Sequence, residues 1–279
     1  MLRDNPSPPL HHAVALGLVQ GPAELLPVSS SAHTTLIPLL LGWPAAELDA
    51  GQRKSLEIAL HAGAGAALAI DMRRELLDAA AGLSPQRLLV VALSLAPPAL
   101  AGLTLRRTIE WRLGGPRSIA AGLLAGGVAM AVADRAGGRA DRTREQARAL
   151  DGLALGLAQA VALIPGVSRH GATLAVARAR GFGRADAQEL SWHAGVPVML
   201  GASVLEGVGF ARRPQRLRTP APLLAGAAAA FASTLLSARL LRRRALRSLT
   251  PFAIYRTALA ALVLACTRRS RRPKTDPNR

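Results

Sequence analysis

Long stretches without any aspartate, glutamate, lysine or arginine are the feature that most constrains this sequence. They lie at 25–46, 88–105, 118–133, 152–168, 190–205 and 219–238, and shorter ones lie at 58–70 and 257–267. A helix that crosses a bilayer needs ~20 mostly apolar residues, and several stretches reach that length once their flanks are included. A soluble helix would instead carry charges along one face. The stretches therefore predict an all-α, polytopic membrane protein, because a membrane barrel would need short alternating strands.

The charge between the stretches is strongly basic. The chain has 35 Lys+Arg against 17 Asp+Glu, a formal net charge of +18. Such a balance suits nucleic-acid binding, but the basic clusters alternate with apolar stretches, so we expect no nucleic-acid partner. Basic loops tend to stay cytoplasmic, which predicts a basic cytoplasmic tail at 268–279. The other loops stay ambiguous, since the clusters at 212–218 and 242–247 flank a single stretch. One cysteine, Cys266, excludes a disulfide scaffold.

The two halves of the chain share a pattern. The segment ALGLVQ at 15–20 returns as ALGLAQ at 154–159, 139 residues later. The same offset carries Ser29 onto Ser168, and a proline precedes each serine by a few residues. Chance similarity between alanine- and leucine-rich segments is the alternative, but the shared Gln, Pro and Ser argue against it. We predict one transmembrane domain over 1–279, with a first repeat at about 10–135 and a second at about 149–267.

Both halves also contain a helix break. Pro27 interrupts the first half, and Pro165 with Gly166 interrupts the second. Proline removes a backbone donor and breaks a helix. Within hydrocarbon, a break is tolerated only where protein or a water-filled cavity covers it. Both breaks are therefore predicted to lie in the protein interior, where repeats of this kind bring interrupted helices to a common site.

Polar residues gather at the first break. They are Gln20, Glu24, Ser29, Ser30, Ser31 and His33. Gln20 and Glu24 are four residues apart and therefore share a helix face. A carboxylate inside the membrane is costly, so it is by default a functional residue. The alternatives are that the serines bond back to the chain, that Glu24 lies at the interface, and that His33 is a satisfied polar residue.

The second break supplies a positive charge beside small and hydroxyl residues. The eight residues after Pro165 include Ser168, Arg169 and Thr173. In the first half, the helix that restarts after the Pro-Val-Ser break at 27–29 offers free N–H groups and serine caps. In the second half, the Arg169 guanidinium can bind phosphate oxygens through two donors. Glu24 can hold a divalent cation or move a proton. Together the two breaks predict a site for a phosphorylated anion. The remaining histidines of note, His11, His12, His61 and His193, are expected to be structural.

These residues resemble the motifs of the undecaprenyl-diphosphatase family, bacterial membrane enzymes linked to bacitracin resistance. The family's (Glu/Gln)-x-x-x-Glu followed by Pro-Val-Ser-Ser and a histidine is similar to 20–33 here. Its Pro-Gly-x-Ser-Arg-Ser-Gly-Ala-Thr resembles 165–173, and further similarity at 56–58 and 251–256 extends it over nearly the whole chain. The resemblance implies an integral inner-membrane hydrolase with inverted repeats and re-entrant helices. It implies removal of one phosphate from undecaprenyl diphosphate, which regenerates the lipid carrier for cell-wall synthesis.

The resemblance also assigns roles to residues. It implies that Glu24, His33, Ser30 and Arg169 are catalytic, and that Gln20, Ser29, Ser31, Ser168 and Thr173 bind the substrate. A divalent cation, Mg²⁺ or Ca²⁺, is expected at Glu24, in a site that opens toward the periplasm. The partners implied are the polyprenyl diphosphate lipid and the bilayer, and a homodimer is left open.

Four positions depart from the family's pattern. Gln20 leaves one carboxylate where a pair would bind metal better, Ala32 replaces a glycine, His170 replaces a serine and His61 replaces a glutamine. These departures concern the metal and the proton relay more than the reaction. The main rival is a polyprenyl-phosphate transporter or flippase, since broken helices at the midplane are also transporter architecture. The other lipid phosphatase superfamily is disfavoured, because neither lysine begins its Lys-x6-Arg-Pro motif.

Overall fold

The computed structural model describes residues 8–43, 48, 50–82, 84–137, 141–211, 220–242 and 246–269. These residues form twelve α-helices, and no strand occurs among them beyond an isolated bridge between Arg142 and Phe182. The helices are α1 (Leu10–Leu25), α2 (Ser30–Leu41), α3 (Ala50–Asp71), α4 (Arg73–Ala81), α5 (Pro85–Thr104), α6 (Arg106–Leu113), α7 (Pro116–Ala136), α8 (Ala149–Val161), α9 (Arg169–Ala179), α10 (Arg184–Ala211), α11 (Ala221–Ser237) and α12 (Thr250–Arg269). The all-α prediction is confirmed. Most of the predicted tail, from residue 270 on, lies outside the described residues.

Four of the helices are long and apolar enough to cross a membrane. They are α5, α7, α11 with the π-helical turn that continues it to Leu241, and α12. They contain the uncharged stretches at 88–105, 118–133, 219–238 and 257–267 almost completely. Their outer faces carry exposed leucines such as Leu103 and Leu224. This combination of length and exposed apolar surface is typical of helices that face lipid, and it confirms the polytopic membrane architecture.

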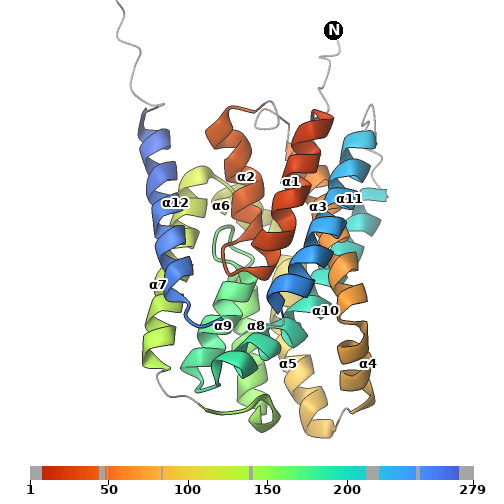
Figure 1. Ribbon diagram of the computed structural model, residues 1–279, viewed down its shortest axis with the longest axis vertical. Helices are drawn as coiled ribbons and strands as arrows, with labels where there is room; N and C mark the ends of the chain where they lie inside the picture. Colours follow the sequence, from red (N-terminus) through yellow and green to blue (C-terminus); the bar gives the residue numbers. More distant parts are fainter. Residues whose placement is uncertain are drawn as a thin grey trace, which may run out of the picture.

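Two other uncharged stretches form broken helices instead of simple spans. The stretch at 25–46 is divided between the end of α1 and the short α2, and the stretch at 152–168 lies in α8 and the loop before α9. In Figure 1, α1 and α2 occupy the upper half of the molecule and α8 and α9 the lower half, so the two breaks meet near the middle. The breaks lie at the predicted prolines, because Pro27 and Pro165 cannot continue the helical hydrogen-bond pattern.

The two breaks share an unusual backbone conformation. Ser29 has a φ of 75° and Ser168 a φ of 71°, and among the described residues these are the non-glycine positions with positive φ. Such a conformation is costly for a residue with a side chain and persists where the surroundings enforce it. Each strained serine directly precedes a new helix, α2 or α9. The matching conformation fits the predicted repeat, while a two-fold relation between the halves stays a prediction.

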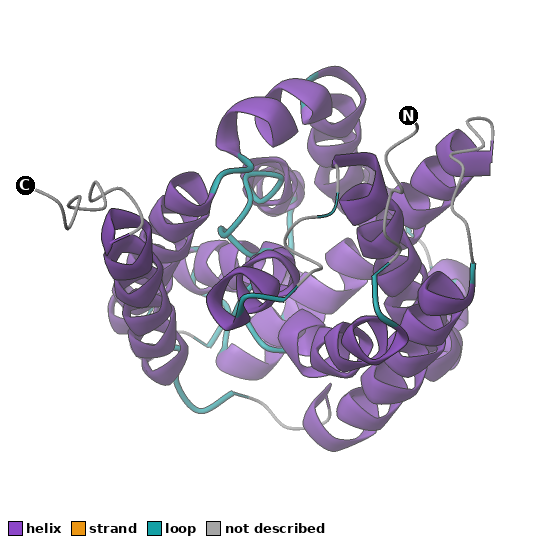
Figure 2. Cartoon of the chain, turned by 90° about the horizontal axis from the view of Figure 1, so that it is seen from above, coloured by secondary structure: helices purple, strands orange, loops and turns teal. Residues whose placement is uncertain are grey.

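Each broken pair is covered by a helix from the other half of the chain. Helix α1 packs on α11, and α8 packs on α5. At these crossings Gly17 lies against the carbonyl of Gly226, and Gly156 lies against the carbonyl of Leu93, with no room for a Cβ atom. Small residues let membrane helices approach this closely. Figure 2, which looks down on the molecule, shows helices on all sides of interior loop segments. Protein therefore covers these segments, as a helix break within a membrane requires.

Candidate active site

An ion pair joins the two breaks. Glu24 lies near the end of α1, and Arg169 is the first residue of α9. Arg169 Nη2 donates to Glu24 Oε1 at 2.7 Å, and the two side chains are only 15% and 7% exposed. Residues that are 145 positions apart in the chain therefore form one buried polar contact. The structure brings these two predicted site residues together, and it places Arg169 in the interior instead of at an exposed helix end.

The other oxygen of Glu24 is held by groups of the first half. Ser30 Oγ donates to Glu24 Oε2 at 2.7 Å, and Gln20 Nε2 donates to the same oxygen at 3.3 Å. The second contact confirms that Gln20 and Glu24 share a helix face. A carboxylate at this distance from a hydroxyl has the geometry of a general base beside a nucleophile. The carboxylate, the hydroxyl and the guanidinium therefore form one cluster.

Three buried polar atoms of this region lack a hydrogen-bond partner. They are Gln20 Oε1, Arg169 Nη1 and His170 Nε2. Buried polar atoms are usually bonded to protein or to water. One unused acceptor and one unused donor thus flank the Glu24 carboxylate, and they give the cluster the capacity to bind a further polar ligand.

A serine cap forms at the second break and not at the first, where it was predicted. Ser168 Oγ accepts a hydrogen bond from the Gly171 amide at 3.2 Å and caps α9. Ser29 makes no such bond to α2, and the cap predicted for it is wrong. Its hydroxyl instead lies 3.3 Å from that of Ser31, although Ser168 forms its cap at a nearly equal φ. Ser29 and Ser31 therefore form a hydroxyl pair next to Ser30.

Thr173 lies in a separate buried hydrogen-bond chain. Its hydroxyl donates to the Arg169 carbonyl at 2.9 Å and lies 2.5 Å from Ser191 Oγ on α10. Ser191 Oγ in turn lies 2.7 Å from His170 Nδ1. The bonds of Thr173 thus join the first turn of α9, which begins with Arg169, to α10. None of these bonds reaches Glu24. Sequence reasoning did not single out Ser191, since no local pattern marks it.

His33 is bonded away from the Glu24 cluster. Its Nδ1 lies 2.7 Å from the Ser29 carbonyl, and its Nε2 lies 2.7 Å from the hydroxyl of Tyr255 on α12. A carbonyl oxygen can only accept, so Nδ1 carries the proton and Nε2 accepts from Tyr255. The two rings are also parallel within 6°. Tyr255 fixes the tautomer and orientation of His33, and only its place in a family motif drew attention to it.

The histidines expected to be structural make local contacts. His61 Nδ1 donates to the Glu57 carbonyl at 2.9 Å, and His193 Nδ1 donates to the Glu189 carbonyl at 2.8 Å. The ring of His12 stacks on Trp43 and also contacts His11. Each bond to a carbonyl four residues earlier belongs to the side chain's own helix, so these contacts agree with the structural interpretation.

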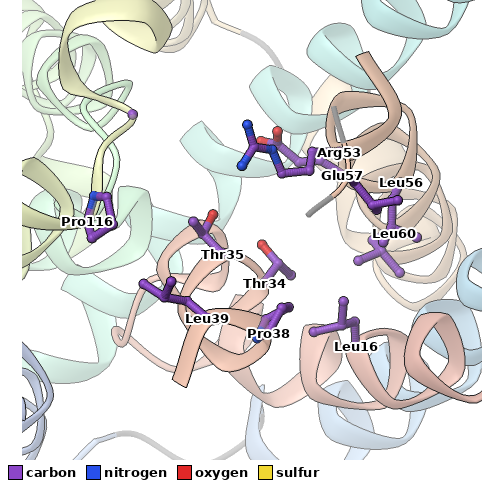
Figure 3. Close-up of a pocket in the computed structure, with 12 residues that line it drawn as sticks. Leu16, Thr34, Thr35, Pro38, Leu39, Arg53, Leu56, Glu57, Leu60 and Pro116 are labelled. Atoms are coloured by element: carbon purple, nitrogen blue, oxygen red, sulfur yellow. The ribbon is translucent and has the colours of Figure 1, made fainter. Parts of the chain in front are cut away.

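A small cavity lies beside α2, one turn beyond the serines. It has a volume of about 140 Å³, and Figure 3 shows Thr34, Thr35 and Arg53 directed toward it. At its edge Lys54 bridges Glu57 and Glu110, at 3.1 and 2.8 Å. Burial by itself raises the pKa of Glu110, but Lys54 and Arg106 outweigh burial and hold that pKa below the usual value of a glutamate. Glu24 and Arg169 do not line this cavity.

Gly195 provides the space that the Arg169 side chain needs. A Cβ atom at Gly195 would overlap Arg169 Nη1. We expect Gly195→Ala to displace the guanidinium from Glu24 and to lower phosphate-releasing activity about tenfold or more, because a displacement of about 1 Å can cost ~100-fold. Gly201→Ala on the same helix is the matched control, since a Cβ there meets nothing within 4 Å. Equal activity of the two variants, measured as phosphate release, would show that the Arg169 position does not matter.

The comparisons with known proteins agree over most of the chain. A family model described as bacitracin resistance protein BacA matches residues 13–262. An undecaprenyl-diphosphatase of Geobacter sulfurreducens is 40% identical over 268 residues, which cover 91% of this chain and 97% of the relative. Proteins of the same name from Ruegeria pomeroyi and Gemmatimonas aurantiaca are 36% and 35% identical, over 91% of this chain and 97% and 96% of the relatives.

Proposed function

Because the chain belongs to the bacitracin resistance protein BacA family, we propose that it hydrolyses undecaprenyl diphosphate to undecaprenyl phosphate and inorganic phosphate. It is a multi-pass protein of the bacterial inner membrane, and the described residues include four helices able to cross the bilayer. The reaction would return the lipid carrier to cell-wall synthesis. The observation that carries the proposal is the Glu24 carboxylate, which contacts a hydroxyl from its own break and a guanidinium from the other.

Glu24 and Ser30 provide the acid–base part of the reaction. The 2.7 Å hydrogen bond lets Glu24 take the proton of the attacking oxygen, either that of Ser30 or that of a water held by the same pair. Attack on the terminal phosphorus breaks its bond to the bridging oxygen and releases undecaprenyl phosphate. If Ser30 attacks, water then frees the phosphate from the serine. General-base catalysis of this kind typically contributes about 10²- to 10⁴-fold.

Arg169 provides the electrostatic part. Its Nη2 is engaged by Glu24, while its buried Nη1 has no partner and can donate to a phosphate oxygen. A fixed guanidinium stabilises charge that develops during phosphoryl transfer without reorganisation. Ser168 caps the helix that carries Arg169 and Thr173 ties its first turn to α10, so both contribute to the position of the guanidinium. His33, held by Tyr255, is proposed to assist from the next turn of α2.

A divalent cation fits this donor set if the substrate supplies further ligands. Glu24 and the unpaired Gln20 Oε1 offer oxygen atoms, which Mg²⁺ and Ca²⁺ prefer, and Mg²⁺ commonly uses one or two carboxylates together with phosphates. Within the described ranges, no group of three or more His, Cys, Asp or Glu could hold a metal alone. Glu24 and Gln20 would hold the cation, and it would neutralise charge on the diphosphate.

Hydrolysis is tested with purified protein in detergent, where no leaflets exist. We expect undecaprenyl diphosphate to yield equal amounts of phosphate and undecaprenyl phosphate in the presence of Mg²⁺. A chelator is expected to slow the reaction at least about tenfold, with recovery on addition of Mg²⁺. A polyprenyl-phosphate transporter would release no phosphate in detergent, and that outcome would replace the hydrolase by the rival function.

The membrane side of the site and the oligomeric state are separate proposals. The family resemblance favours a site that opens to the periplasm and allows a homodimer. Labelling of single cysteines in a Cys266→Ser background from each side of sealed vesicles tests the first. Light scattering of the purified protein in detergent measures the second.

A further inference from the structure

A buried arginine joins the backbones of the two breaks. Arg256 lies on α12 and is 0% exposed. Its Nη1 donates to the carbonyl of Pro27 at 3.1 Å, in the first break. Its Nη2 donates to the carbonyls of Gly166 and Val167 at 2.7 and 2.8 Å, in the second break. The guanidinium also bonds to α7, through the carbonyls of Gly122 and Leu123 at 3.2 and 3.1 Å.

The chemistry of these contacts explains why an arginine stands there. A helix break frees carbonyl groups from the helical pattern, and each buried carbonyl then needs a donor. A guanidinium offers five N–H donors in a fixed plane, whereas a lysine offers three from one point. The bonds described for Arg256 all go to main-chain oxygens. Taken together, they satisfy both breaks through one rigid side chain and compensate for the cost of burying its charge.

The bonded carbonyls lie directly next to the catalytic cluster in sequence. Pro27 precedes Ser30 by three residues, and Val167 precedes Arg169 by two. Between them lie the strained serines, Ser29 and Ser168, whose positive φ angles depend on a fixed surrounding backbone. A change in the separation of the two carbonyls would therefore move the Ser30 hydroxyl relative to the Arg169 guanidinium.

Glycines on α7 and α9 make room for the guanidinium. A Cβ atom at Gly126 would overlap Arg256 Nη2, and one at Gly171 would lie 3.1 Å from Arg256 Nη1. The next residue, Gly127, differs, since a Cβ there would meet only ordinary contacts, the nearest at 3.4 Å from the carbonyl of Ala253. The space at Gly126 is thus needed by the Arg256 head group and by the Val167 carbonyl that it bonds, which would lie 2.6 Å from such a Cβ atom.

We propose that Arg256 is a positioning residue that fixes the separation of the two breaks and thereby brings Ser30 and Arg169 to Glu24. The proposal rests on the proposed hydrolase function for its kinetic consequences, but its geometric content can be measured without turnover. Arg256 has no contact with Glu24 among its described bonds, so it acts through the backbone and not on the substrate.

The kinetic experiment separates positioning from folding. We expect Arg256→Lys to lower kcat about a hundredfold with KM changed less than about threefold, because misplacement by about 1 Å costs that much while part of the phosphate site remains. The matched control is Arg178→Lys, which changes another fully buried arginine that bonds the Phe182 carbonyl at the opposite end of α9 from the break. It is expected to lower the melting temperature and to keep the parent kcat. Equal kcat values for the two variants would overturn the proposal.

A second pair of variants tests the same point with Arg256 in place. Gly126→Ala crowds both the guanidinium and the Val167 carbonyl that it bonds, so it is expected to lower kcat about tenfold or more. Gly127→Ala is expected to stay within about twofold of the parent. If Arg256→Lys does not fold, this pair still decides the question, and equal rates for the two glycine variants would contradict it.

The closing experiment measures the separation of the breaks directly. Spin labels at Leu26 and Leu163, two partly exposed positions beside the breaks, are placed in a Cys266→Ser background. We expect one narrow distance distribution in the parent, Arg178→Lys and Gly127→Ala, and a shifted or broadened one in Arg256→Lys and Gly126→Ala. An unchanged distribution refutes the positioning role. Absence of phosphate release by the parent refutes the hydrolase function instead, and the distances still decide the role of Arg256.

Discussion

Replacement of Glu24 by glutamine is expected to lower the rate of phosphate release about a thousandfold while the fold is retained. Glutamine keeps an oxygen that can accept from Arg169, and it keeps the size of the side chain. It loses the negative charge, and with it the base that faces Ser30 Oγ at 2.7 Å and the charged ligand for a cation. Loss of a general base typically costs about 10²- to 10⁴-fold. Steady-state phosphate release from undecaprenyl diphosphate, with a melting curve for each protein, measures both quantities.

A second buried carboxylate serves as the control for Glu24. Asp151 on α8 is 1% exposed and pairs with Arg142 and Arg180, at 2.8 and 2.7 Å. Asp151→Asn is expected to lower the melting temperature and to leave kcat of the folded protein close to that of the parent. Near-normal hydrolysis by Glu24→Gln at saturating Mg²⁺ would remove Glu24 from the mechanism. In the companion variant Gln20→Glu, half-maximal activity is expected at a lower cation concentration, because a second carboxylate is added.

Replacement of Arg169 is expected to have an effect of similar size. A donor fixed at the developing charge is worth about 3–4 kcal/mol of barrier, or on the order of a hundred- to a thousandfold in rate. Lysine keeps the charge but loses the planar fork, so it cannot hold Glu24 and a phosphate oxygen from two adjacent nitrogens. We expect Arg169→Ala to release almost no phosphate and Arg169→Lys to release it about a hundredfold more slowly than the parent. Water admitted to the cluster should keep both variants folded.

The competing interpretation is that Arg169 only anchors the start of a helix. In that case the Arg169→Lys variant would hydrolyse undecaprenyl diphosphate at close to the parent rate, because a lysine side chain reaches the headgroups as well as an arginine does. Arg180, just beyond the other end of α9, provides the comparison: it is 40% exposed and bonds Asp151. Arg180→Lys is expected to stay near the parent rate. Similar rates for Arg169→Lys and Arg180→Lys would favour the anchoring role.

Sequence reasoning predicted the helices and the breaks because both depend on local composition. Four uncharged stretches lie in helices long enough to span a membrane, and helices end before Pro27 and Pro165, which lack the backbone donor that would continue them. The residues at the breaks could be named for the same reason. Their pairing could not, because the contact between Glu24 and Arg169 depends on how two distant helix pairs meet. The missing cap at Ser29 shows the same limit, since Ser168 has nearly the same φ and does form its cap.

Supporting residues escaped prediction for a different reason. Gly195 matters through the absence of a side chain, Tyr255 through a ring from a distant helix, and Arg256 through bonds to main-chain carbonyls. None of these contacts leaves a local pattern of residue types. Ser191 is similar, since one serine in an apolar helix more often bonds to its own backbone. The contacts of such residues become visible only once the two breaks have been placed in one interior, although the family similarity at 251–256 includes Tyr255 and Arg256.

The central claim is that a carboxylate from the first break and a guanidinium from the second act as one site. The most direct measurement is a double-mutant cycle of phosphate release with Glu24→Gln, Arg169→Lys and the two combined. Residues that act as a unit are strongly non-additive, so the double variant is expected to be about as slow as Glu24→Gln alone, roughly a thousandfold below the parent. A double variant slower by the product of the two single effects, on the order of 10⁵-fold, would show that the residues act independently and would contradict the claim.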